Sequence, residues 1–285
     1  MAEKLNKVHQ EIVDYYDITT KDYLRAWTDI DSSAFHFGFY DENANNHKDA
    51  LVNTNKVFAE LAGIKAGDKV LDAGCGIGGS SFWLAKNLDA RPTGITLSQG
   101  HVDHCNNRSK VLGLSDKTNF VVGDYINSPF EDESFDVIWS CETLCYIAEK
   151  EEFYKESYRL LKPGGRVIIA DGILTEKVNT PDEKKIMDDW NKGWAMQGLY
   201  TKAKHEEAAK AAGISEFVVM DYTHKTFVSL RNLYRKSKNW LGFFKFLTFL
   251  GFRSEIQLKN QEASIRQFEG LEKKLWFYGV MIGKK

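Results

Sequence analysis

The chain has little excess charge of either sign, because 38 Lys and Arg residues nearly balance 40 Asp and Glu residues. The formal net charge of −2 gives no electric field that would gather nucleic acid, so we expect no nucleic-acid partner. The four cysteines lack the paired spacing of zinc sites, and the beginning of the sequence is polar, unlike a signal peptide. We therefore predict no metal site, reduced thiols and a cytoplasmic location.

The sequence also lacks a hydrophobic run long enough to span a membrane. Residues 240–252 form its most apolar stretch, which is shorter than the roughly 20 residues of a membrane span and is interrupted by Lys245. A helix here would place four apolar side chains on one stripe, Phe243, Phe246, Leu247 and Leu250. This stripe predicts a cap helix packed on the domain. The aromatic side chains are also compatible with the wall of an acceptor pocket, or with transient contact at a membrane surface.

What the sequence does contain is a glycine-rich turn that follows a predicted buried strand. Its glycines, at Gly74, Gly76 and Gly78, allow the backbone to approach a ligand, and the next helix presents free amides there. Asp72 ends the strand and adds a negative charge beside the turn. That charge would repel a pyrophosphate and attract the ammonium group of an amino-acid-like ligand. The alternative role for Asp72 is a polar cap on the turn.

Gly74, Gly76 and Gly79 also have the spacing of a dinucleotide site, which requires an acidic residue about 20 positions further on. The second predicted strand, residues 91–95, is instead followed by Thr96, Leu97, Ser98 and Gln99. A nicotinamide dehydrogenase is therefore disfavoured. Asp124 ends a third predicted strand, where it could accept a hydrogen bond from an adenine amino group or cap a helix.

Three segments together resemble the class I S-adenosylmethionine-dependent methyltransferases: Asp72–Gly78, Gly123–Asp124 and Leu161–Gly165. The resemblance covers about residues 68–174 and implies S-adenosyl-L-methionine as cofactor. It implies that Asp72 and the three glycines hold the amino-acid part of the cofactor. Four residues would surround ribose and adenine, Thr96, Leu97, Ser98 and Gln99, and two would meet the adenine edge, Asp124 and Tyr125. Some relatives have a glutamine, expected on the ribose, where this chain has His101. His101 could replace it as a hydrogen-bond donor or lie on the exposed face of the helix, and Gln99 is a candidate to take over the ribose contact.

The middle of the chain alternates predicted strands and helices, which implies a parallel sheet covered on both faces. Strands are expected near 69–74, 91–97, 119–124, 136–141, 166–173, 217–223 and 275–282. The resemblance implies a Rossmann-like α/β fold with a seven-stranded, mostly parallel sheet, its last strand antiparallel between the fifth and sixth. We expect helices over 182–212, and two helices in 4–27 with a break at Thr19–Asp22.

We predict a single domain over residues 1–285. Its parts are an N-terminal helical and aromatic segment (1–62), a cofactor-binding core (63–175) and a helical cap insertion (225–272). The N-terminal segment resembles that of sterol, tocopherol and natural-product methyltransferases, in which it folds over the cofactor and the acceptor.

Methyl transfer from a sulfonium is an in-line displacement, so it needs positioning rather than a protein nucleophile. Glu142 followed by Tyr146 resembles the arrangement in geranyl diphosphate C-methyltransferases. The resemblance implies that Glu142 acts as a base or orients a metal-bound diphosphate, and that the Tyr146 ring stabilises a cation. In the structural alternative, Glu142 binds a backbone amide and Tyr146 packs in the core.

Two further residues are catalytic candidates. Asp171 aligns with an acidic residue of sugar O-methyltransferases, although a loop cap is an equal alternative. His36 lies in an aromatic segment that could reach the acceptor, although such a histidine is more often structural. We predict methyl transfer to a small, largely apolar acceptor such as a terpenoid, sterol or quinol, with C-methylation favoured. The alternatives are O-methylation of a glycosylated or polyketide natural product, which would use Asp171 and His36, and a non-catalytic cofactor-binding protein.

Overall fold

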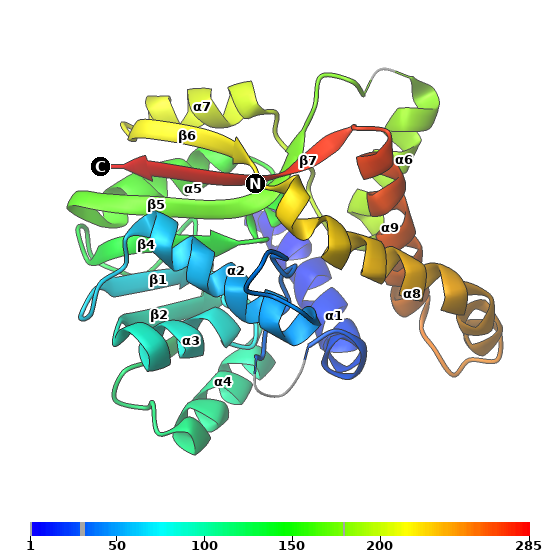
Figure 1. Cartoon of the computed structure of the whole chain (residues 1–285), viewed down its shortest axis with the longest axis horizontal. Helices are drawn as coiled ribbons and strands as arrows, with labels where there is room; N and C mark the ends of the chain where they lie inside the picture. The colour runs from blue at the N-terminus through cyan, green and yellow to red at the C-terminus, as the bar shows by residue number, and fades with distance from the viewer. Residues whose placement is uncertain (1, 29–31, 179) are drawn as a thin grey trace.

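A seven-stranded sheet runs through the computed structural model, which describes residues 2–28, 32–178 and 180–285 (Figure 1). The strands are β1 (Lys69–Ala73), β2 (Arg91–Thr96), β3 (Asn119–Val122), β4 (Phe135–Cys141), β5 (Leu161–Leu174), β6 (Ser215–Asp221) and β7 (Trp276–Lys284). Their order is β3-β2-β1-β4-β5-β7-β6. β7 is antiparallel to β5 and β6, whereas the other pairs are parallel. The predicted α/β fold and the place of the last strand are confirmed.

The central strands are apolar on both faces because each face is covered by helices. Val137 and Trp139 of β4 belong to one core cluster, while Ile138 between them belongs to the other. The first cluster includes Phe58 of α2 (His47–Ala62), and the second includes Phe153 of α5 (Lys150–Leu160). This alternation explains why these strands have continuous apolar sequences, as buried parallel strands do.

Three further helices connect strands along the sheet. They are α3 (Gly79–Leu88), α4 (Gln99–Leu112) and α7 (Lys202–Ala211). The side chain of Ser98 caps α4 by accepting a hydrogen bond from the amide of His101, and Gly113 ends the helix in the left-handed conformation. Both ends of α4 are therefore set by local sequence.

The N-terminal helix differs from our prediction. We expected two helices with a break at Thr19–Asp22, but α1 is one continuous helix over Ala2–Ala26. The Thr19 hydroxyl donates a 2.7 Å hydrogen bond to the carbonyl of Tyr15, one turn earlier. Because this bond satisfies the hydroxyl inside the helix, Thr19 does not act as a cap.

The remaining helices form a cap beside the sheet: α6 (Pro181–Gly193), α8 (Thr223–Phe249) and α9 (Glu255–Glu272). The helical region expected over 182–212 is interrupted by residues 194–201, which separate α6 from α7. α6 and α9 pack closely, since a Cβ on Gly193 would lie only 2.5 Å from the Cβ of Ala263. α8 leaves the sheet and extends to one side of the molecule, and α9 returns beside it (Figure 1).

The stripe that we expected to pack α8 on the domain does not do so. Phe243, Phe246 and Leu250 are exposed large hydrophobic residues. The buried residues of α8 all lie before its aromatic end, at Thr226, Ser229, Leu230 and Ser237. The helix is therefore anchored near the sheet, and its apolar outer end is left in contact with solvent.

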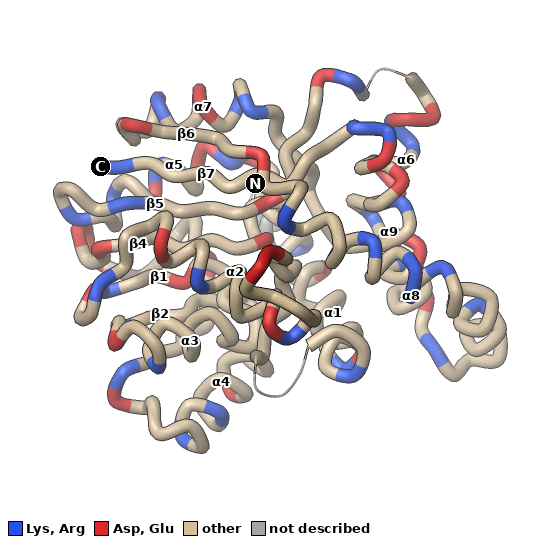
Figure 2. The backbone as a smooth tube through the Cα atoms, viewed as in Figure 1, with Lys and Arg blue, Asp and Glu red and all other residues tan. Residues whose placement is uncertain are grey.

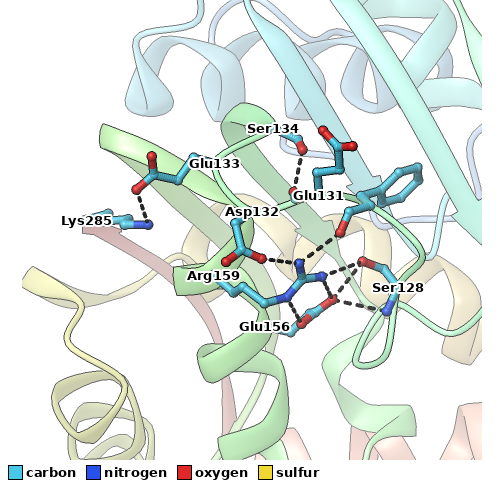
Figure 3. A network of polar contacts seen from close by, with 9 residues as sticks. Ser128, Glu131, Asp132, Glu133, Ser134, Glu156, Arg159 and Lys285 are labelled. Carbon is cyan, nitrogen blue, oxygen red and sulfur yellow. Dashed lines mark hydrogen bonds and ion pairs between the residues drawn. The ribbon is translucent and has the colours of Figure 1, made fainter.

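A polar network holds the loop between β3 and β4 against α5 (Figure 3). Arg159 of α5 donates hydrogen bonds to Asp132 and to Glu156, at 2.6 and 2.7 Å respectively. Glu156 in turn accepts a 2.7 Å hydrogen bond from the Ser128 hydroxyl. The network fixes the far end of a loop whose beginning carries Asp124.

Candidate functional site

A large cavity lies at the carboxyl ends of β1 to β4, where ligands bind in open α/β sheets. Its volume is about 1350 Å³, which exceeds the roughly 300–1,000 Å³ of a typical small-molecule site. Side chains of α1 and α8 also line it, so the N-terminal helix and the cap enclose the space in front of the sheet. The cavity therefore has room for two ligands side by side.

The glycine turn after β1 forms one wall of this cavity. Gly74, Gly76 and Gly78 all have positive φ angles, at 83°, 51° and 86°. A Cβ on Gly74 would lie 2.5 Å from Cγ2 of Thr143, so no larger residue fits there. Gly74 and Gly76 line the cavity, whereas Gly78 lies just behind it as the N-cap of α3. Gly78 thus shapes the turn rather than the wall.

Asp72 places a buried carboxyl group in the wall of the cavity. Its Oδ2 accepts a 2.6 Å hydrogen bond from the Ser81 hydroxyl. Burial raises the pKa of Asp72 to about 6, so the group is mostly ionised at neutral pH. No Lys or Arg of the described residues forms an ion pair with it. The site therefore offers an uncompensated negative charge to a cationic ligand group.

The segment after β2 contributes three of the four residues that we predicted. Thr96, Leu97 and Ser98 line the cavity. Gln99 is exposed, and its Nε2 donates a 2.8 Å hydrogen bond to Asp103 one turn further along α4. Because Gln99 lies on the outer face of the helix, it does not reach the ribose position in this structure.

His101 takes the place in the cavity wall that we had considered for Gln99. The imidazole is buried rather than on the exposed face of α4, and its Nε2 lies 3.1 Å from Oγ1 of Thr20 in α1. Burial lowers the pKa of His101 to about 4, so the ring is neutral at physiological pH. A neutral ring here can exchange its contact with Thr20 for a hydrogen bond to a ligand.

Asp124 and Tyr125 follow β3 and also line the cavity. Asp124 Oδ1 accepts a 3.0 Å hydrogen bond from the amide of Ile126, which is a turn contact rather than a helix cap. Its Oδ2 lies 3.2 Å from Nε2 of His9, a residue of α1. The Tyr125 hydroxyl donates a 2.7 Å hydrogen bond to the carbonyl of Thr143. α1 thus covers the position that we predicted for adenine.

Glu142 lines the cavity immediately after β4, the strand that pairs with β1. Its Oε1 accepts hydrogen bonds from the amide of Phe37 at 2.8 Å and from the hydroxyl of Tyr278 at 2.7 Å. Burial raises the pKa of Glu142 to about 8. Its φ of 58° is uncommon for a residue with a side chain and directs this part of the loop toward the cavity. The backbone contact that we considered as an alternative role is present, and the carboxyl group still lines the cavity.

Tyr146 lies in a short 3-10 helix, η1 (Leu144–Tyr146), and its side chain lines the cavity rather than only the core. Its hydroxyl accepts a 2.8 Å hydrogen bond from Tyr16 of α1. The two ring centroids are 5.7 Å apart. Tyr15 and Tyr23 continue this group, with their hydroxyl oxygens 2.8 Å apart. Tyr16, Tyr23 and Tyr146 line the cavity and form a tyrosine wall, and such rings favour apolar and cationic groups.

Asp171 and His36 line the same cavity but have structural partners. The two Asp171 oxygens accept hydrogen bonds from the amides of Cys145, at 2.9 Å, and Gly172, at 2.7 Å. Burial raises the pKa of Asp171 to about 6. His36 Nδ1 lies 3.0 Å from the carbonyl of Phe37, and burial lowers the pKa of this histidine to about 4. Asp171 therefore has the contacts of a loop cap, and His36 is a neutral ring.

Sequence reasoning missed several residues of the wall. Tyr278 of β7, His9 of α1 and Trp194 after α6 all line the cavity. Their positions depend on long-range packing, since Tyr278 meets a glutamate 136 residues away. The paired Tyr15 and Tyr16 were a visible signal for the N-terminal segment, but not for individual contacts.

Comparisons with known proteins agree with this geometry. A family model described as a methyltransferase domain matches residues 71–169. The chain is 32% identical over 213 residues to 24-methylenesterol C-methyltransferase 3 of Arabidopsis thaliana, covering 74% of this chain and 58% of that protein. It is 27% identical over 301 residues to the chloroplastic tocopherol O-methyltransferase of the same plant, covering 100% of this chain and 84% of that protein. The chain thus spans little more than half the length of the sterol enzyme.

Solved structures share the fold along nearly the whole chain. The [4+2]-cyclase SpnF superposes with a TM-score of 0.79 at 21% identity, covering 97% of this chain and 95% of that one. A geranyl diphosphate methyltransferase solved with geranyl diphosphate and sinefungin gives a TM-score of 0.74 at 19% identity, covering 98% and 99%. Residues 71–169 thus match a methyltransferase domain, and the chain is similar in sequence to sterol and tocopherol methyltransferases.

Proposed function

We propose that the protein transfers a methyl group from S-adenosyl-L-methionine to a small, largely apolar acceptor, and that the acceptor atom is carbon. The observation that carries this proposal is the single cavity of about 1350 Å³. The glycine turn, Asp72, Glu142 and the tyrosine wall all line it. The cofactor fits at the glycine turn and Asp72, the acceptor fits beside Glu142 and the tyrosine wall, and a methyl group can pass between the two ligands.

The residues beside β1 and β3 fit the cofactor. Asp72 offers a buried charge without a cationic partner among the described residues, which suits the ammonium group of the amino-acid part. Asp124 Oδ1 accepts a hydrogen bond from the Ile126 amide. Oδ2, which lies near His9, can accept one from the adenine amino group once His9 moves aside. Bound there, the cofactor supplies an electrophilic methyl group. The chain's contribution is to hold the two ligands in line, which accounts for much of the rate of such displacements.

Glu142 is suited to remove a proton from the methylated acceptor. Addition of a methyl group to a carbon–carbon double bond leaves a positive charge on the acceptor, and loss of a proton from the adjacent carbon restores the double bond. The Glu142 carboxylate accepts that proton and becomes neutral, a form that its buried site favours because its pKa is raised to about 8. The rings of Tyr146 and Tyr16 line the same cavity and would stabilise the transient cation.

The relatives support an acceptor of the lipid class. One is by name a sterol C-methyltransferase and another a tocopherol O-methyltransferase, and both names describe acceptors with long apolar parts. O-methylation by Asp171 and His36 has less support. Both Asp171 oxygens already accept backbone hydrogen bonds, and that role would require His36 to be rearranged from its contact with the Phe37 carbonyl.

The experiment is a transfer assay with S-adenosylmethionine labelled in its methyl group. Sterol, prenyl diphosphate, quinol and glycoside acceptors are compared, and the labelled product is identified by mass spectrometry. We expect label on carbon of a sterol or prenyl acceptor, together with release of S-adenosylhomocysteine. Label on oxygen of a glycoside would contradict the proposal, and tight cofactor binding without turnover of any acceptor would favour a non-catalytic protein.

A further inference from the structure

The outer end of α8 and the residues after it carry large apolar side chains in contact with solvent. We call residues 240–252 the aromatic tip. Its exposed members are Trp240, Phe243, Phe246, Phe249, Leu250 and Phe252. Phe249 is 84% exposed and Phe252 is 76% exposed, so most of each side chain is in contact with solvent. A cluster of this kind marks an interaction site rather than ordinary surface.

The segment that carries the aromatic tip has charges of one sign. Residues 222–254 contain no Asp or Glu but have seven cationic side chains, Lys225, Arg231, Arg235, Lys236, Lys238, Lys245 and Arg253. In Figure 2, α8 carries several blue segments and no red one. Among the described residues, the carboxylates that pair with this region come from elsewhere, as Glu262 does with Lys245 and Asp22 with Arg253. Lys225 is likewise paired with Asp41, but four cations of α8 form no ion pair within the described residues, Arg231, Arg235, Lys236 and Lys238. This part of α8 is therefore a basic patch on a chain whose net charge is −2.

The aromatic tip is continuous with the cavity. Trp240 and Phe243 are exposed on the surface, and both also line the cavity, together with Phe244. An apolar molecule that approaches the tip can therefore move along these rings into the space beside the tyrosine wall. This continuity distinguishes the tip from an apolar surface that is remote from the site.

We propose that the aromatic tip docks on the surface of an anionic lipid bilayer and opens the acceptor side of the cavity toward it. The rings enter the boundary between headgroups and acyl chains, while the lysines and arginines of α8 contact the anionic headgroups. Within the described ranges, no helix is long and apolar enough to cross a bilayer. Delivery of an apolar acceptor by this route rests on the proposed function, whereas docking itself does not.

A second copy of the chain is a poorer occupant of the aromatic tip. In a symmetric dimer the same surface meets itself. Two basic patches would then face one another, and like charges across an interface weaken association. An anionic bilayer complements both the rings and the charge.

The test is co-sedimentation of the full chain with lipid vesicles, without acceptor. Vesicles of phosphatidylcholine with phosphatidylserine are compared with vesicles of phosphatidylcholine alone. The double variant Phe249→Ser, Phe252→Ser changes two rings that do not line the cavity. Val111→Ser is the matched control, because Val111 is 76% exposed on α4, away from the tip.

We expect binding to be about tenfold stronger on the anionic vesicles and to weaken at high salt. The double variant should bind about tenfold more weakly than the unchanged chain, whereas Val111→Ser should bind equally well. The inference is overturned if the unchanged chain stays in the supernatant with anionic vesicles, or if the double variant binds them as strongly as the unchanged chain. It is also overturned if sedimentation without vesicles shows that two copies of the chain associate through the aromatic tip. S-adenosylhomocysteine binding and transfer to a detergent-dispersed acceptor, measured on the same variants, test the proposed function separately.

Discussion

At the scale of single residues, cofactor affinity depends most directly on Asp72. Asp72→Asn removes the charge but keeps an acceptor for the Ser81 hydroxyl. We expect S-adenosylhomocysteine to bind at least tenfold more weakly, which corresponds to ~1.4 kcal/mol for a charge-assisted contact. Isothermal titration calorimetry measures this change. Gln99→Ala is the control, because Gln99 bonds Asp103 on the outer face of α4 and should leave affinity unchanged. Equal affinity of Asp72→Asn and the unchanged chain would show that the loop is assigned wrongly.

Glu142 predicts the pH dependence of the reaction. Its pKa is raised to about 8 by burial, so below that pH the carboxyl group is mostly protonated and cannot accept a proton. We expect kcat/KM to rise with pH and to level off above about 8. Glu142→Gln should lower turnover strongly, and its kcat/KM should no longer rise with pH in this range. If kcat/KM of Glu142→Gln still rises with pH, the rise is due to another titrating group.

The same raised pKa has a consequence for stability. The folded state holds the proton of Glu142 more tightly than the unfolded chain, whose glutamate pKa is near 4.5. The stability that this proton provides is therefore present below about 4.5 and is lost as the pH rises toward 8. Relative to the unchanged chain, Glu142→Gln should gain thermal stability between pH 5 and 8.5, a range set by these pKa values. The melting temperatures of the two proteins are measured across this range of pH. A difference between them that stays constant with pH would contradict the expectation.

Local sequence predicted the residues of the cofactor side better than those of the acceptor side. Asp72, Gly74 and Gly76 lie within one strand and turn, so their placement follows from short-range geometry. The partners of Glu142 could not be predicted in this way. Its side chain meets Phe37 and Tyr278, which lie 105 and 136 residues away in the sequence.

At the scale of elements, α1 acts as a cover over the cofactor side. Its side chains contact the cavity wall through His9 at Asp124 and Thr20 at His101. Tyr16 adds a contact with Tyr146. These three contacts are polar. A cofactor bound beneath α1 would add its own apolar and polar contacts with the helix. We expect S-adenosylhomocysteine to slow amide hydrogen exchange in residues 7–26, measured by mass spectrometry. Exchange in α7, which is remote from the cavity, should stay unchanged, and an equal change in both would contradict a local cover.

α1 and α8 differed from prediction for opposite reasons. α1 continues through Thr19 because a side chain bonds within the helix. The stripe of α8 is exposed because the helix extends beyond the rest of the domain. Periodicity in the sequence does not predict how far a helix extends beyond the residues that pack against it. Periodicity predicts which side chains share a face, but the surrounding fold decides whether that face is covered.

At the scale of the whole molecule, the cavity is the meeting place of the N-terminal helix, the sheet edge and the cap. Strand alternation in the sequence predicted a parallel sheet, whereas the place of the antiparallel β7 came from the resemblance to methyltransferases. The shape and volume of the cavity follow from how these three parts pack together. No single segment of sequence carries that information.

A crystal structure of the protein with S-adenosylhomocysteine is the most direct measurement. The amino-acid end should lie at Asp72, the adenine at Asp124, and the sulfur should face the space between Glu142 and Tyr146. An electron density map that shows the molecule elsewhere, or a different nucleotide in this place, would contradict the assignment of the cavity.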